Sequence, residues 1–137
     1  MEYSTLDKLG VRVSRLGFGC MRFPLTAEGK IDEPRAAAML DTAYKAGVTY
    51  YDTAYFYHQH TGEAFLGRAM KRYPRDTFYL ATKMPMSIVE SLDHAKEIFE
   101  GQLAALQTDY VDFYLLHGVN GERWKRAQEM GIVDFLL

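Results

Sequence analysis

The sequence has 137 residues, of which 48% are apolar, and its net charge is −2 with acidic and basic residues interspersed. These values predict one globular domain over residues 1–137, and they exclude a clustered basic surface for nucleic acid and a membrane span of about 20 apolar residues. The single cysteine, Cys20, permits no internal disulfide, and the N-terminus lacks the features of a signal peptide, so we expect a cytoplasmic protein.

Short apolar segments and helical patterns alternate along the chain. Residues 3–16 alternate around a Leu-Gly pair and predict a short β-hairpin. Strands are predicted at residues 15–21, 48–54, 78–84 and 111–117, whose apolar runs start 32, 30 and 33 residues apart. Helical periodicity fills the gaps at residues 35–46, 62–73 and 88–107, and a fourth pattern starts at residue 122 and is weakened by Gly131. This order predicts an α/β fold built from parallel β/α units.

Two architectures use such units, and the first one fails on its glycines. A doubly wound sheet that binds a dinucleotide needs a third glycine in its first turn, but only Gly17 and Gly19 are present there. The remaining candidate is a (β/α) barrel of TIM-barrel type, which takes roughly 250 residues, so this chain holds only about the first four units. Because an open sheet leaves its outer strands unpaired, we expect self-association through these strand edges.

Ionisable residues lie near the ends of three successive predicted strands. Asp52, Lys83 and His117 occupy these positions, and Tyr57 lies just past the first of them. Taken singly, the three residues read as a turn carboxylate, a surface amine and a hydrogen-bonded core imidazole. Since all three fall at the carboxyl ends of parallel strands, where barrel enzymes place their chemistry, we expect them to form one site.

The chemistry of these groups points to proton donation. A phenol has a pKa near ~10, and a lysine ammonium a few ångströms away favours the phenolate and lowers that pKa. A carboxylate keeps such an ammonium charged in an apolar cup, and an imidazole can orient an oxygen atom. Together the groups form a proton donor aimed at a developing alkoxide, as the reduction of a carbonyl group requires. Hydride would then come from a bound nicotinamide cofactor.

Four segments, "RLGFGCMRF", "DTAYFYHQHTGEAFLGRAM", "FYLATKM" and "DYVDFYLLHG", resemble the aldo-keto reductase family, and the resemblance covers essentially the whole chain. It implies a catalytic tetrad of Asp52, Tyr57, Lys83 and His117. In that reading Tyr57 is the general acid, Lys83 and Asp52 tune it, and His117 orients a small aldehyde or ketone. It also implies NADPH as the reductant, with Asp52 and His117 at the nicotinamide end.

The resemblance is closest to bacterial members that carry a ferredoxin-like or iron–sulfur module. The cysteine-rich module of those proteins is not found in these 137 residues, so no cluster is expected here. Members of the family have eight strands and hold most of the cofactor on the later ones, which are expected beyond Leu137. We therefore expect the isolated chain to bind NADPH weakly or not at all, and to turn over poorly.

Two other functions stay open at this point. His58 and His60 form an H-x-H pair, which with His117 and Asp52 would suit a metal-assisted hydrolase, although no metal site is assigned. The second alternative is a non-catalytic half-barrel that acts as an assembly module or is a fragment. Replacing Tyr57 with phenylalanine is expected to abolish carbonyl reduction and spare hydrolysis, whereas replacing both histidines with alanine is expected to do the reverse.

Overall fold

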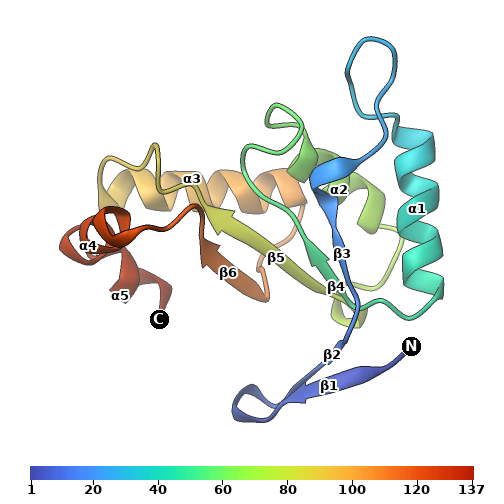
Figure 1. The fold of residues 1–137 in the computed structure, drawn as a ribbon, viewed down its shortest axis with the longest axis horizontal. Coiled ribbons are helices and arrows are strands. Elements are labelled where there is room, and N and C mark those ends of the chain that lie inside the picture. The colour runs from blue at the N-terminus through green and yellow to red at the C-terminus, as the bar shows by residue number, and fades with distance from the viewer.

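A computed structural model describes all residues, 1–137, as a hairpin followed by a four-stranded parallel sheet with helices along it (Figure 1). Strands β1 (Tyr3–Leu6) and β2 (Val11–Ser14) pair antiparallel, which confirms the predicted hairpin. The parallel sheet has the order β3-β4-β5-β6. Its strands are β3 (Gly17–Gly19), β4 (Tyr50–Asp52), β5 (Tyr79–Met84) and β6 (Phe113–Leu116).

Helices connect and follow the parallel strands. They are α1 (Glu33–Lys45), α2 (Gly62–Met70), α3 (Leu92–Leu106), α4 (Gly121–Glu129) and α5 (Ile132–Leu136), with short 3-10 turns η1 (Asp7–Leu9), η2 (Cys20–Arg22) and η3 (Arg75–Thr77). The strand–helix order and the parallel pairing confirm the predicted β/α units of barrel type. None of the helices is both long and apolar enough to cross a membrane.

Side-chain caps decide where two of the helices begin. The side chain of Asp32 accepts a hydrogen bond from the Arg35 amide, so α1 starts next to Pro34 as its sequence predicts. Ser91 caps α3 in the same way, which starts this helix at Leu92 rather than at residue 88. Residues 88–91 therefore belong to the loop between β5 and α3.

The fourth helical pattern is divided at Gly131. This residue has a φ of +71°, a left-handed conformation that glycine adopts easily, and it separates α4 from α5. Ala127 of α4 and Ile132 of α5 are both fully buried, and they pack in one apolar cluster with Met84 at the end of β5. The break therefore folds the C-terminal segment back onto the end of the sheet.

The two faces of the sheet have different environments. Tyr51, Leu80 and Met84 are buried in the apolar core, which the helices complete. On the other face the rings of Tyr50 and Phe113 lie 5.1 Å apart and are only partly buried. This second face corresponds to the interior of a barrel, and it is the face that carries the site.

The strand register brings the candidate residues to one edge of this interior face. Asp52 is paired with Ala81, so Lys83 lies two residues further along β5. Lys83 is in turn paired with Leu115, so His117 lies two residues further along the last strand. The amide of His117 continues the ladder by donating to the Met84 carbonyl at 2.8 Å. Because side chains alternate with a period of two, all three residues point to the same face.

Candidate active site

Lys83 is the best anchored member of the site. Its Nζ donates to Oδ1 of Asp52 and to the carbonyl oxygen of Thr53, both at 2.6 Å. The Lys83 side chain is 13% exposed and that of Asp52 is 30% exposed, so the pair is only partly screened by water. These two bonds use two of the three ammonium hydrogens, and they fix the cation at the mouth of the sheet interior.

Tyr57 and His117 complete the group around this cation. The Lys83 Nζ lies 5.2 Å from the centre of the Tyr57 ring. The Tyr57 ring stands perpendicular to the imidazole of His117, with 6.1 Å between the ring centres. The structure thus brings together all four side chains that the sequence singles out. The Tyr57 hydroxyl makes no hydrogen bond within the protein, and it is therefore free to donate to a ligand.

The imidazole of His117 is held in its neutral form. Burial lowers its pKa from the ordinary value of 6.5, and the positive charge of Lys83 lowers it further, while the carboxylate of Asp52 acts in the opposite direction. The Nδ1 atom is buried and has no hydrogen-bond partner in the protein. Since buried polar atoms are usually paired, this unpaired nitrogen is an exception within the site.

Tyr57 is positioned by an unusual turn. The residues that follow it, His58, Gln59 and His60, have φ angles of +52°, +54° and +68°, a conformation that costs non-glycine residues about 1–2 kcal/mol each. Gly62 closes the turn by donating its amide to the Tyr57 carbonyl at 3.2 Å. The turn therefore stores local strain next to the phenol, as functional sites often do.

Comparison with known proteins identifies the family of the chain. The sequence model described as "Aldo/keto reductase family" matches residues 15–125, which is most of the chain. The chain belongs to the aldo/keto reductase family. It is 34% identical over 125 residues to the aldo-keto reductase YhdN of Bacillus subtilis, and the match covers 85% of this chain and 38% of that protein.

Solved aldo-keto reductases share the fold. The crystal structure of a thermostable aldo-keto reductase, Tm1743, in complex with the inhibitor epalrestat has a TM-score of 0.76 and 29% identity; the alignment covers 99% of this chain and 51% of that one. An aldo-keto reductase of Klebsiella pneumoniae in complex with NADPH has a TM-score of 0.73 and 25% identity, over 98% and 47% of the two chains. The present aldo/keto reductase chain thus spans about half the length of these structures, and its four strands are part of a (β/α) barrel.

The two histidines after Tyr57 have separate partners in this aldo/keto reductase chain. The Phe23 amide donates to Nε2 of His58 at 3.3 Å, and the same nitrogen lies 3.2 Å from the Cys20 carbonyl, so one tautomer satisfies only one of them. The ring of His60 packs against the edge of Tyr55 at 4.9 Å. No group of three or more potential metal-binding side chains exists, so the metal-hydrolase alternative gains no support.

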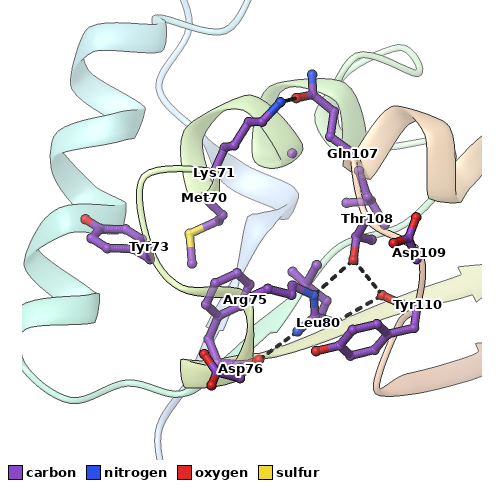
Figure 2. Close-up of a pocket in the computed structure, with 13 residues that line it drawn as sticks. Met70, Lys71, Tyr73, Arg75, Asp76, Leu80, Gln107, Thr108, Asp109 and Tyr110 are labelled. Carbon is purple, nitrogen blue, oxygen red and sulfur yellow. Dashed lines mark hydrogen bonds between the residues drawn. The ribbon is translucent and has the colours of Figure 1, made fainter.

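A hollow of about 540 Å³ lies at the opposite end of β5 from Lys83, and no tetrad residue lines it. Figure 2 shows Arg75 in this hollow, where its guanidinium donates to the hydroxyl of Thr108 and to the carbonyl of Tyr110. It also forms a 2.6 Å ion pair with Asp112, just before β6. These bonds join the segment before β5 to the segment before β6. The polar groups in this hollow therefore have a structural role.

Two polar groups near the site could not be identified from the sequence. The Thr53 carbonyl that receives Lys83 is a backbone atom, and no pattern of side chains indicates it. Glu63 reads as an exposed acid in the first turn of a helix, but it is only 5% exposed. It lies in a hydrogen-bonded group with Thr82 and Gln102, on the helix side of β5. The three residues lie far apart in the sequence, so only the packing of α2 and α3 on β5 reveals them.

Proposed function

We propose that this chain carries the acid–base part of a site that reduces small aldehydes and ketones, with Tyr57 as the general acid. The observation that supports it is the Lys83 ammonium, which is bonded to Asp52 and lies 5.2 Å from the Tyr57 ring. A fixed cation at this position favours the phenolate that remains after the proton has left. A cytoplasmic location completes the proposal, and it rests on the amino-acid composition alone.

The four side chains divide the work as follows. Tyr57 donates its hydroxyl proton to the carbonyl oxygen as that oxygen gains negative charge, and it regains a proton from solvent afterwards. Asp52 holds the Lys83 ammonium in place and replaces part of the hydration that an ammonium loses in a partly buried site. The neutral imidazole of His117 can donate one hydrogen bond, and it orients the carbonyl oxygen next to the phenol.

The reductant that fits this proposal is NADPH, which when bound supplies hydride to the carbonyl carbon. The partly exposed imidazole of His117 and the partly exposed carboxylate of Asp52 suit the polar nicotinamide end. The Klebsiella protein in complex with NADPH supports the choice of cofactor. This chain alone offers few other contacts for so large a molecule, so we expect it to bind NADPH only weakly.

Two measurements test this proposal. In the longest form of the protein that carries this segment, Tyr57→Phe is expected to lower the NADPH-dependent reduction of 4-nitrobenzaldehyde about 10²–10⁴-fold. The matched control Tyr110→Phe removes a hydroxyl at the other end of β5 and is expected to leave the rate unchanged. Equal rates for both variants would refute the assignment of Tyr57. For the 137-residue chain, a fluorescence titration with micromolar NADPH affinity would refute the expectation of weak binding.

We also propose that the open edges of the sheet promote self-association. Strands β3 and β6 each pair with only one neighbour. Leu115 on the outermost strand is 41% exposed, and unpaired apolar strands tend to join other chains. Light scattering is expected to give a mass above that of one chain, and that mass should rise with concentration. A constant monomer mass up to about 1 mM would contradict this.

A further inference from the structure

A buried carboxyl group lies outside the tetrad, between α2, α3 and β5. Oε1 of Glu63 accepts hydrogen bonds from the Thr82 hydroxyl and, at 2.7 Å, from Nε2 of Gln102. Gln102 is itself fixed, because its Nε2 also donates to the Lys83 carbonyl at 3.1 Å and its Oε1 accepts from the Tyr114 hydroxyl. Oε2 of Glu63 accepts no hydrogen bond from the protein. Oε1 is thus fully used as an acceptor, whereas Oε2 can still accept a hydrogen bond.

This carboxyl group lines a hollow of about 440 Å³, within the size range of small-ligand sites. Its lining residues are Tyr55, His60, Glu63, Gly101, Gln102 and Ala105. The rings of Tyr55 and His60 meet edge to face with 4.9 Å between their centres, and they form an aromatic wall. The hollow therefore combines an aromatic wall, a buried acid and a floor of two small residues.

Gly101 is one of the residues that line the hollow. It lies inside α3, where glycine is about 1 kcal/mol less favourable than alanine. A Cβ atom built on Gly101 would meet no atom within 4 Å, and its φ is not positive, so neither packing nor backbone conformation requires glycine here. Because Gly101 lines the same hollow as Glu63, its lack of a side chain leaves room in that hollow.

We propose that this hollow binds a small organic cation, namely a primary ammonium attached to a compact aromatic or apolar group. The ammonium donates to the free oxygen of Glu63, which gives a charge-assisted hydrogen bond in a partly dry site. The apolar part packs on the aromatic wall, where the ring of Tyr55 also attracts the positive charge. The site is separate from the tetrad, and the proposal does not depend on carbonyl reduction.

The ionisation of Glu63 sets the expected pH dependence. The pKa of Glu63 is raised above its ordinary value, and burial is the main cause. The hydrogen bonds from Thr82 and Gln102 and the charges of Lys83 and His60 act in the opposite direction. A bound cation stabilises the carboxylate, so binding is expected to weaken as the pH falls and Glu63 takes up a proton.

Benzylammonium is a suitable probe for the 137-residue chain, with ¹H–¹⁵N NMR shifts as the readout. We expect saturable binding in the millimolar range, with shifts at Gly101 and Glu63, and at least tenfold weaker binding of the neutral benzyl alcohol. Glu63→Gln keeps acceptors for Thr82 and Gln102 but removes the charge, and it is expected to weaken benzylammonium at least tenfold. The proposal is overturned by no saturation at 20 mM, by equal binding of the alcohol, or by an unaffected Glu63→Gln variant.

Three further variants keep the test decisive if Glu63→Gln fails to fold. Gly101→Leu fills the hollow without touching the acid and should abolish binding, whereas the matched Gly101→Ala adds one methyl group and should retain it within about threefold. Asp52→Asn removes the other nearby carboxylate and should leave benzylammonium binding unchanged. If Asp52→Asn abolishes binding while Gly101→Leu does not, the probe occupies the tetrad and the proposal is wrong.

Discussion

The two glycines inside helices α2 and α3 differ in what surrounds them, so we expect opposite effects from the same substitution. A Cβ atom on Gly67 would meet backbone atoms of Ala105 and Leu106 at 2.6 Å. A Cβ atom on Gly101 would meet nothing within 4 Å. Gly67→Ala is therefore expected to destabilise the protein and Gly101→Ala to stabilise it. The contrast tests the close approach of α2 to the end of α3, which brings Glu63 and Gln102 together.

The magnitudes follow from these contacts. Alanine is about 1 kcal/mol more favourable than glycine inside a helix, and Gly101→Ala should gain most of that value. At Gly67 the same gain is opposed by overpacking, which typically costs 1–3 kcal/mol, and the upper end applies because rigid backbone has to move by roughly 0.8 Å to restore ordinary contact. We expect Gly67→Ala to lower the free energy of unfolding by about 1–2 kcal/mol, so the two variants should differ by about 2–3 kcal/mol.

Urea unfolding followed by far-UV circular dichroism measures this difference. With an m-value of about 1–3 kcal/mol/M for a chain of this size, the two midpoints should lie about 0.7–3 M apart, with the wild-type midpoint between them. The comparison requires equal m-values for the variants and the wild type. A changed m-value would mean that the substitution altered the compactness of the folded or the unfolded state. Two midpoints above that of the wild type would refute the proposed approach of the helices.

Three further predictions concern the site and its surroundings. Asp52→Ala should lower the free energy of unfolding by about 1–3 kcal/mol because it strands the Lys83 ammonium, and adding Lys83→Met should recover part of the loss; an additive double variant would contradict the coupling. The imidazole of His117 should titrate below pH 6.5 in an NMR titration of the folded chain. Its contribution to the free energy of unfolding is therefore present above pH 6.5 and is lost as the pH falls through the pKa of the folded state. A titration midpoint at or above 6.5 would refute this. The Cys20 thiol is fully buried and its pKa is raised by burial, so iodoacetamide should modify it only when urea unfolds the chain, and rapid labelling of the native chain would contradict its placement.

Periodicity predicted the architecture because each element buries one face. Short apolar runs gave the strands, and the spacing of about 30 residues between them gave the parallel connection. The positions of Asp52, Lys83 and His117 near the strand ends are visible for the same reason, since charged residues interrupt otherwise apolar runs. Helix boundaries were less visible, because the apolar spacing runs through Ser91 although its side chain caps α3 there.

Other features depend on tertiary contacts that local patterns do not encode. The left-handed turn at His58–His60 contains no glycine, so the residue types that usually indicate such a turn are missing. Glu63 occupies a position that ordinarily faces solvent, and it is buried only because Gln102 and Thr82 arrive from other elements to satisfy it. Long-range pairing of this kind cannot be read from one sequence.

Strand β5 links the tetrad to the second polar cluster. Because neighbouring side chains of a strand point to opposite faces, Lys83 reaches the sheet interior and bonds Asp52, while Thr82 reaches the helix side and bonds Glu63. The two clusters therefore lie back to back, one residue apart in sequence, with the sheet between them. Their one direct bond is the donation from Gln102 to the Lys83 carbonyl, which fixes the backbone of the lysine rather than its ammonium. This separation is why the proposed cation site and the proposed carbonyl-reducing site can be tested with different variants.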